Sequence, residues 1–379
     1  MRSKGLLFLL LPALAVVVSA DAQTPALKAG SNFHIDLPKD SPVTVVSVDM
    51  GQSRAEARGG AMMLDLRTLL TLRNSGSQQI RGAALLVTAQ EVTPGGKASV
   101  IVPSLSVPPG ETFPVRIDLR LLRPLAHGNG PLVRVTLDGV LFDDLTFYGP
   151  NRLNSRRVMT QWELEARRDR RYFLSRLESE GPEGLRKELL ASIARQSERP
   201  RIDVKFARSG RSTNTEPERE IKIAFVSFPD APVEVLGGVA RVAGNEARAP
   251  VIEVQNKSDR IVRHLELGWL IRDRNGREFM GGSVPSDLVL GPGEHSQIAQ
   301  KAALRFSERS NSPVPVQSMT GFVASVEFAD GHLWIPTRSE LAHPRLQRAL
   351  APSPEEQRLT ELYRKKGLAA VVEELKRLR

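Results

Sequence analysis

The chain has 379 residues, a net charge of +10 from 53 basic and 43 acidic side chains, and no cysteine. This length predicts two domains. The hydrophobic content of 41% is enough for buried cores and argues against a largely disordered chain. Because cysteine is absent, disulfides, thiolate metal sites and cysteine nucleophiles are excluded.

The first 22 residues predict a secretory signal peptide. Arg2 and Lys4 precede an apolar run at 6–18, and Ala20-Asp21-Ala22 forms a small-residue cleavage site. A membrane anchor is the alternative, but the run is shorter than the roughly 20 residues that a spanning helix needs. We therefore expect cleavage at residues 1–22, a mature chain beginning at Gln23, and a periplasmic or extracellular location.

The two halves of the chain resemble each other, which predicts a duplicated module. In each half an apolar run ends in a turn that contains an asparagine, and a second run is followed by the triplet Pro-Gly-Glu. The expected matches are Asn74 with Asn256, Gly110 with Gly293, Gly59-Gly60 with Gly237-Gly238, and 138–142 with 330–334.

Short alternating apolar runs separated by turns predict antiparallel strands in both copies. The expected fold class is mainly β with helical additions, as two antiparallel Ig-like β-sandwiches, each followed by a helical pair. Alternation predicts two separate cores. One should contain Leu70, Leu72, Leu85 and Val87, and the other Ile252, Val254, Leu265 and Leu267.

The order of strand, Asn-x-Ser-type turn, strand and Pro-Gly-Glu turn resembles the Ig-like or fibronectin-like modules of exported bacterial proteins, such as the FxLYD and CARDB types. The resemblance covers residues 42–148 and 220–340. It implies β-sandwiches that serve spacing, adhesion or partner binding, usually without catalytic residues.

Helical spacing of apolar residues follows each predicted sandwich. Gly181-Pro182 divides the first helical segment, and Gly367 interrupts the second, which begins with a predicted capping box at 353–356. A polar stretch between them is the candidate linker. The predicted parts are a signal peptide at 1–22, sandwich 1 at 42–150, a helical segment at 155–198, a linker at 199–220, sandwich 2 at 221–345 and a C-terminal helical segment at 353–379.

The sequence offers no catalytic motif, and we predict no catalytic, cofactor-binding or metal-binding residue. Metal-ligand pairs on one helix face, phosphate loops and nucleophile elbows are all missing from it. Asp143-Asp144 would point to opposite faces of a strand, which argues against a paired-carboxylate site. Met62-Met63 suits packing within a strand better than a copper site. A metal site would have to assemble in space from single histidines, three of them in the second module: His34, His127, His264, His295, His332 and His343.

An arginine-rich helical stretch is the candidate binding surface. Its basic side chains are interleaved with aromatic ones, a pattern suited to anionic lipid headgroups, cell-wall polymers or an acidic partner. The alternative is a solvated face in which Glu163 pairs with Arg167 and arginine stems cover the aromatics. The candidate residues are Arg167, Arg168, Arg170, Arg171, Trp162 and Tyr172.

These observations predict an exported, non-enzymatic cell-envelope protein that binds or scaffolds through tandem Ig-like modules. Its expected partner is a protein or an anionic envelope polymer, with peripheral membrane contact possible and no transmembrane segment. Export argues against nucleic acid. The alternative is a carbohydrate-binding or hydrolytic envelope protein with a spatially assembled site in the second sandwich.

Overall fold

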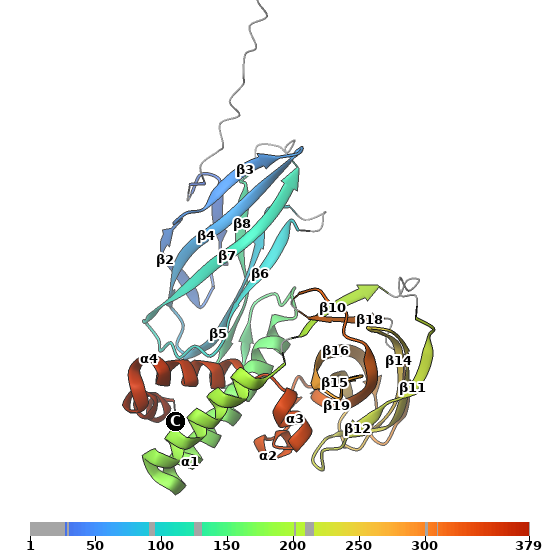
Figure 1. Cartoon of the computed structure of the whole chain (residues 1–379). Helices are drawn as coiled ribbons and strands as arrows, with labels where there is room; N and C mark the ends of the chain where they lie inside the picture. The colour runs from blue at the N-terminus through green and yellow to red at the C-terminus, as the bar shows by residue number, and fades with distance from the viewer. Residues whose placement is uncertain are drawn as a thin grey trace, which may run out of the picture.

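The computed structural model describes residues 27–28, 30–90, 95–124, 131–200, 202–208, 216–299, 302–308 and 310–378. The predicted signal peptide lies outside the described residues. In the described part of the chain, no helix is long and apolar enough to span a membrane. The molecule is mainly β, as predicted, with two groups of sheets and helices between them (Figure 1).

The first β unit consists of strands β1 to β9, which form two sheets around one core. In one sheet the long β4 pairs along its whole length with β7, and along its other edge with β2 and then β3. The other sheet has the order β1-β8-β5-β6, with β9 also on β8 and β1 parallel to β8. The strands are β1 (Phe33–Asp36), β2 (Val43–Asp49), β3 (Arg54–Arg58), β4 (Ala61–Asn74), β5 (Ile80–Thr88), β6 (Lys97–Val102), β7 (Thr112–Pro124), β8 (Val133–Phe142) and β9 (Phe147–Tyr148).

The second β unit consists of strands β10 to β20; one of its sheets repeats the strand order of the first unit, and its other sheet has more strands. One sheet has the order β12-β19-β15-β16, with β20 on β19 and β12 parallel to β19; the other has the order β10-β18-β14-β13-β11, with β17 on β14. The strands are β10 (Ile202–Arg208), β11 (Arg219–Lys222), β12 (Ala224–Val226), β13 (Val233–Ala243), β14 (Glu246–Asn256), β15 (Val262–Asp273), β16 (Glu278–Leu290), β17 (His295–Ala299), β18 (Ala302–Glu308), β19 (Val316–Phe328) and β20 (Leu333–Trp334).

Alternation predicted the two cores correctly, because inward and outward side chains of a strand differ by one residue. All four residues expected in the first core are buried in the first β unit, and all four expected in the second are buried in the second unit. The largest fully buried side chain of the molecule, Trp269, lies in the second core.

The two predicted asparagines have the same role in the two units. Asn74 Nδ2 donates to the Val107 carbonyl at 2.9 Å, and Asn256 Nδ2 donates to the Leu290 carbonyl at 3.0 Å. The Gly110 amide donates to the Asn74 carbonyl, and the Gly293 amide donates to that of Asn256. These equal contacts support the duplication at the end of β4 and β14.

Two other predicted matches are wrong. Gly59-Gly60 forms the turn between β3 and β4, whereas Gly237-Gly238 lies inside β13, directly after a bulge. Residues 138–142 lie within β8, whereas 330–334 form the turn after β19 and the strand β20. The structural counterpart of Asp330 is Asp144, because each carboxylate accepts from the amide two residues later in the same hairpin turn. Dipeptides such as Asp-Gly and Gly-Gly occur in turns and bulges alike, so the same dipeptide in both halves does not identify equivalent positions.

Four helices complete the fold: α1 (Ser155–Glu198), α2 (Arg338–Leu341), α3 (Pro344–Ala349) and α4 (Pro354–Arg377). The start of α1 covers the outer face of the first unit, where Met159 packs with Ala84 and Leu141. The short α3 covers the outer face of the second unit, where Leu346 packs with Phe322. Each unit therefore carries helix on the sheet that contains its parallel strand.

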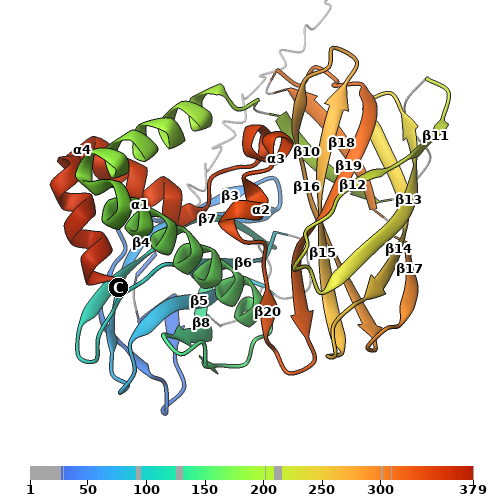
Figure 2. The same cartoon turned by 90° about the horizontal axis from the view of Figure 1, so that it is seen from below.

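Glycine bends both long helices, as the sequence predicted for Gly181 and Gly367. Gly181 has φ 70° and ψ −170°, and Gly367 has φ 80° and ψ −176°, so both leave the helical region. The bent ends of α1 and α4 pack on each other around a shared apolar cluster (Figure 2). Its buried members match between the two helices at one constant sequence separation. Phe173 matches Leu359, Leu185 matches Val371 and Leu189 matches Leu375, and the same separation divides the two glycines. The duplication thus extends into the helices, and the two copies close on each other.

The predicted linker at 199–220 is wrong in part. It contains β10, which pairs antiparallel with β18 at the edge of a sheet, and the beginning of β11. Residues 209–215 of this stretch lie outside the described residues. The strand forms because residues 202–206 alternate apolar and polar, and Ile202 and Val204 pack against the core of the second unit.

Candidate functional site

The predicted arginine surface on α1 is mostly engaged in ion pairs. Arg167 Nε lies 2.9 Å and Arg170 Nη2 2.8 Å from Glu163 Oε1, and Arg168 Nε lies 3.0 Å from Asp169 Oδ1. Arg170 is buried, with 4% of its surface exposed. The four arginines therefore do not form one free basic face, although Arg171 is exposed. The Glu163–Arg167 pair expected in the alternative interpretation is present.

The two predicted aromatic residues are half-buried and have different surroundings. Tyr172 lies between two guanidinium groups, with Arg338 4.8 Å and Arg176 5.3 Å from its ring centroid. These distances suit cation–π contacts. Tyr172 is also one wall of a cavity, whereas Trp162 does not line it.

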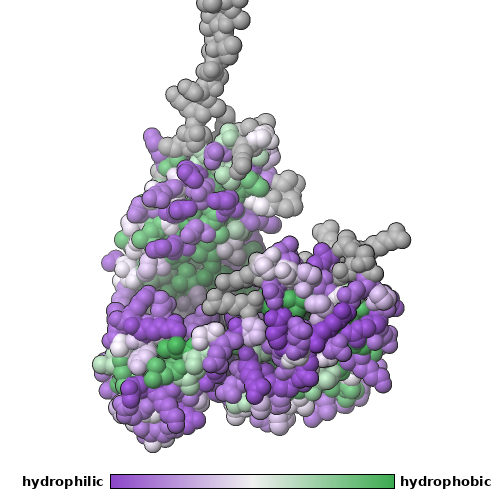
Figure 3. Space-filling view, in the orientation of Figure 1, coloured by the Kyte–Doolittle hydropathy of each residue, from purple (hydrophilic) through white to green (hydrophobic). Residues whose placement is uncertain are grey.

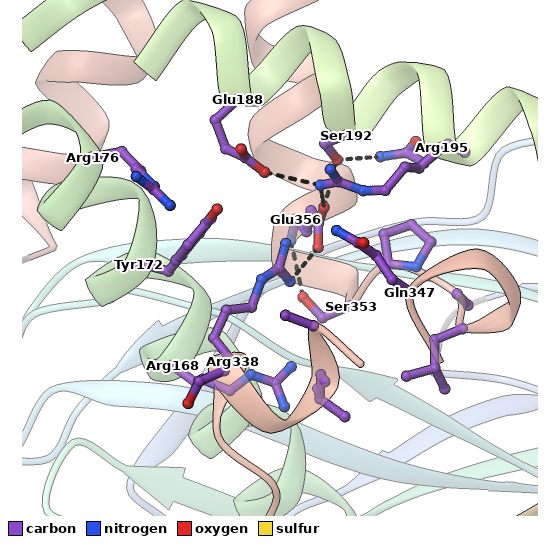
Figure 4. A pocket seen from close by; sticks show the side chains of 17 residues that line it. Arg168, Tyr172, Arg176, Glu188, Ser192, Arg195, Arg338, Gln347, Ser353 and Glu356 are labelled. Carbon is purple, nitrogen blue, oxygen red and sulfur yellow. Dashed lines mark hydrogen bonds and ion pairs between the residues drawn. The ribbon is translucent and has the colours of Figure 1, made fainter. Parts of the chain in front are cut away.

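The cavity has a volume of about 350 Å³ and lies between α1 and the segment from α2 to α4 (Figure 4). It combines charged, polar and small apolar side chains from both halves of the chain. The lining residues are Arg168, Tyr172, Arg176, Glu188, Ser192, Arg195, Gln196, Arg338, Ser339, Leu341, Ala342, Gln347, Leu350, Ala351, Pro352, Ser353 and Glu356.

The cavity exists where the helical path of the second half is interrupted. Residues 350–353 are not helical and separate α3 from α4. The sequence separation that matches Phe173 with Leu359 also matches these residues with 164–167. Those residues lie in the unbroken first part of α1. Pro352 favours this break because the residue before a proline disfavours the helical conformation. The cavity is therefore a difference between the two copies.

Glu356 is the centre of the charge network in the cavity. Its carboxylate accepts from Arg338 Nη1 at 2.7 Å and from the Ser192 hydroxyl at 2.5 Å, and lies 3.4 Å from Arg195 Nη2. The predicted capping box is therefore incomplete. The Ser353 hydroxyl does accept from the Glu356 amide, but the Glu356 side chain is turned to these partners. Thr337 and Glu340 form a complete capping box on α2 instead.

The electrostatics keep this network charged. Burial alone would raise the pKa of Glu356, but the hydrogen bond and charge of Arg338 outweigh it, so that pKa lies below its ordinary value. Desolvation would lower the pKa of Arg338, and the bond to Glu356 raises it instead. An ionised carboxylate has no proton to donate, so Glu356 in this state does not act as a general acid.

The structure does not assemble the histidines of the second unit into a metal site. His264 is buried and its Nδ1 lies 2.7 Å from Asp287 Oδ1, beside Arg157 of α1. His295 and His332 are exposed. Within the described ranges, no three His, Cys, Asp or Glu side chains come together in a way that could hold a metal ion. His127 lies outside these ranges.

Comparisons with known proteins give no assignment. No family model and no curated protein matches the chain. Among solved structures, a hypothetical protein from Peptoclostridium difficile 630 shares 12% identity at a TM-score of 0.23, covering 35% of this chain and 100% of its own. A structural genomics target shares 14% identity at a TM-score of 0.17, covering 35% of this chain and 78% of its own. A β-glucosidase from Kluyveromyces marxianus in complex with glucose shares 8% identity at a TM-score of 0.15, covering 73% of this chain and 46% of its own. At such TM-scores the likenesses carry no argument about fold or function.

Proposed function

We propose that this chain is an exported, non-enzymatic protein of the cell envelope that scaffolds or binds partners through two Ig-like β-sandwiches. The observation that carries the proposal is the closure of the duplicated helices on each other. Because Phe173 and Leu359 are buried in one shared cluster, the two β units are held in a fixed relation rather than on a loose tether. A rigid body with two similar arms suits a scaffold.

Exposed apolar side chains on the β units support a role in partner binding. In the first unit, Val46, Leu69 and Leu122 are 53%, 37% and 45% exposed, all on one sheet. Figure 3 shows apolar residues gathered over strands of this unit. In the second unit Leu236 is 48% exposed, and it occupies the same bulge position as Val46. Apolar residues grouped on a surface are typical of interaction sites.

Site-specific photocrosslinking in the native host tests the proposal. A photoreactive residue at Leu69 or Leu236 should give a discrete adduct with another envelope component, whereas the same residue at exposed Leu190 on α1 serves as the control. The protein recovered from the envelope should begin at Gln23. Recovery of the uncleaved chain from the cytoplasm, or adducts at neither β position, would overturn the proposal.

A further inference from the structure

We infer that the cavity between α1 and α2–α4 binds a small amphiphilic acid, a molecule with one carboxylate or phosphate group on a short apolar body. This inference goes beyond the scaffold role and does not depend on it. The cavity has a volume of about 350 Å³, which falls within the range of small-molecule sites, roughly 300 to 1,000 Å³.

The accessible charge in the cavity is positive. Four arginines line it against two glutamates. The side chain of Glu356 is only 4% exposed, whereas those of Arg338, Arg195 and Arg176 are 24%, 27% and 41% exposed. The other glutamate, Glu188, is 20% exposed and is paired with Arg195, so an entering molecule meets mainly guanidinium groups.

Two of these guanidinium groups have hydrogen-bonding capacity left. Among the described residues, Arg195 donates to Glu188 and Glu356 from Nη2, and Arg338 donates to Asp169 and Glu356 from Nη1. A guanidinium carries five N–H donors in a planar fork. Carboxylate and phosphate oxygens match that fork, which makes an acidic head group the expected ligand chemistry.

Part of the lining is apolar. Leu341, Ala342, Leu350, Ala351 and Pro352 contribute side chains there, and the Tyr172 ring adds an aromatic wall. Figure 4 shows Tyr172, Arg195 and Arg338 around the same space. A site with a few charged groups and an apolar wall favours a ligand with both characters over inorganic phosphate alone.

The test is calorimetric titration of the mature chain with hexanoate and with hexyl phosphate, and with 1-hexanol as the neutral control. We expect saturable binding of at least one of the two acids and none of the alcohol. Whichever acid binds more tightly identifies the head group. Arg195→Gln should weaken binding roughly tenfold or more, because a charge-assisted hydrogen bond is lost. Arg186→Gln, on the same helix but in an exposed pair with Glu183, should leave binding unchanged.

A second variant covers the case in which Arg195→Gln disturbs the folded network. Ala351→Trp adds bulk at the cavity wall and keeps every charge in place, so it should weaken binding as Arg195→Gln does. Binding that survives in both variants would overturn the inference, as would the absence of saturable binding by either acid. Equal binding of 1-hexanol would overturn it too, since the arginines would then play no part.

Discussion

The first and second halves of this chain share the strand order of one sheet but differ in how their helices run. In the first half α1 continues without a break from the outer face of the sheet to Gly181. In the second half the corresponding residues form two separate helices, α3 and α4. The difference creates the cavity, because the interruption at 350–353 leaves space beside the arginines of α1.

The comparison teaches that the two copies are constrained differently in different places. The end of each long strand, the glycine bends and the helical cluster are alike in both halves. The helical cluster holds the two copies together, and each asparagine fixes the end of a long strand within its own unit. The interruption at 350–353 has no counterpart in α1. A feature present in one copy alone is therefore the better candidate for a special function.

The largest expected effect comes from breaking the symmetric cluster. Phe173→Ala should lower the free energy of unfolding by about 3–5 kcal/mol and Leu359→Ala by about 2–5 kcal/mol, since both side chains are fully buried. Urea unfolding followed by circular dichroism measures both. Leu190→Ala, at a 48% exposed position on α1, should change the free energy of unfolding by less than about 0.5 kcal/mol. If Leu359→Ala left the free energy of unfolding unchanged, α4 would not be an equal partner of α1 in this cluster.

The next effect sharpens the comparison at a charged position. Glu355 and Asp169 occupy equivalent places, and both are buried. Glu355 lies 3.5 Å from Arg170 Nη1 and 2.7 Å from Arg358 Nη2. Glu355→Gln should therefore cost about 3 kcal/mol, as expected when one partner of a buried pair is removed. Glu183→Gln, in an exposed pair with Arg186, should cost at most about 1 kcal/mol. Equal costs would mean that burial does not distinguish the two pairs.

Local patterns explain what the sequence could predict. The strands, both cores and both helix bends depend on alternation, turn residues and single glycines, which are visible within a short window. The Glu163–Arg167 pair was predictable for the same reason, because the two residues are one helical turn apart.

Non-local contacts explain what it could not predict. The central residues of the cavity, Ser192, Arg338 and Glu356, come from three different helices, and no spacing between them is informative. The order of the predicted parts suggested a duplication that includes the helices, but the matching positions within them were not found. Two of the three buried pairs preserve apolar character without identity, as Phe173 and Leu359 show. Arginines on one helix suggested a free surface because their buried carboxylate partners could not be recognised as buried.

The two glycine bends offer a matched pair of smaller effects. Gly181→Ala and Gly367→Ala should each destabilise the fold by about 1–3 kcal/mol, because positive φ with ψ near 180° is open almost only to glycine. No neighbouring atom lies within 4 Å of an added Cβ at either position, so the cost is conformational. Gly237→Ala has equally open space and no positive φ, and should be nearly neutral. Thermal unfolding of the three variants compares them directly. A cost at one bend alone would contradict their equivalence.

The last prediction is a change in pH dependence at a position where the two copies carry opposite charges. Glu356 corresponds by spacing to Arg170. The folded chain lowers the pKa of Glu356, since the hydrogen bond and charge of Arg338 outweigh burial. A lowered pKa means that ionised Glu356 stabilises the fold above the pKa of an unfolded glutamate, about 4.3, and that this stabilisation is lost as pH falls further. Glu356→Gln should therefore be less stable than the unsubstituted chain at pH 7, with a gap that narrows below about pH 4.5. Urea unfolding at pH 7, 5 and 3.5 measures the gap. A gap that stays constant down to pH 3.5 would show that Glu356 contributes through packing and not through its charge.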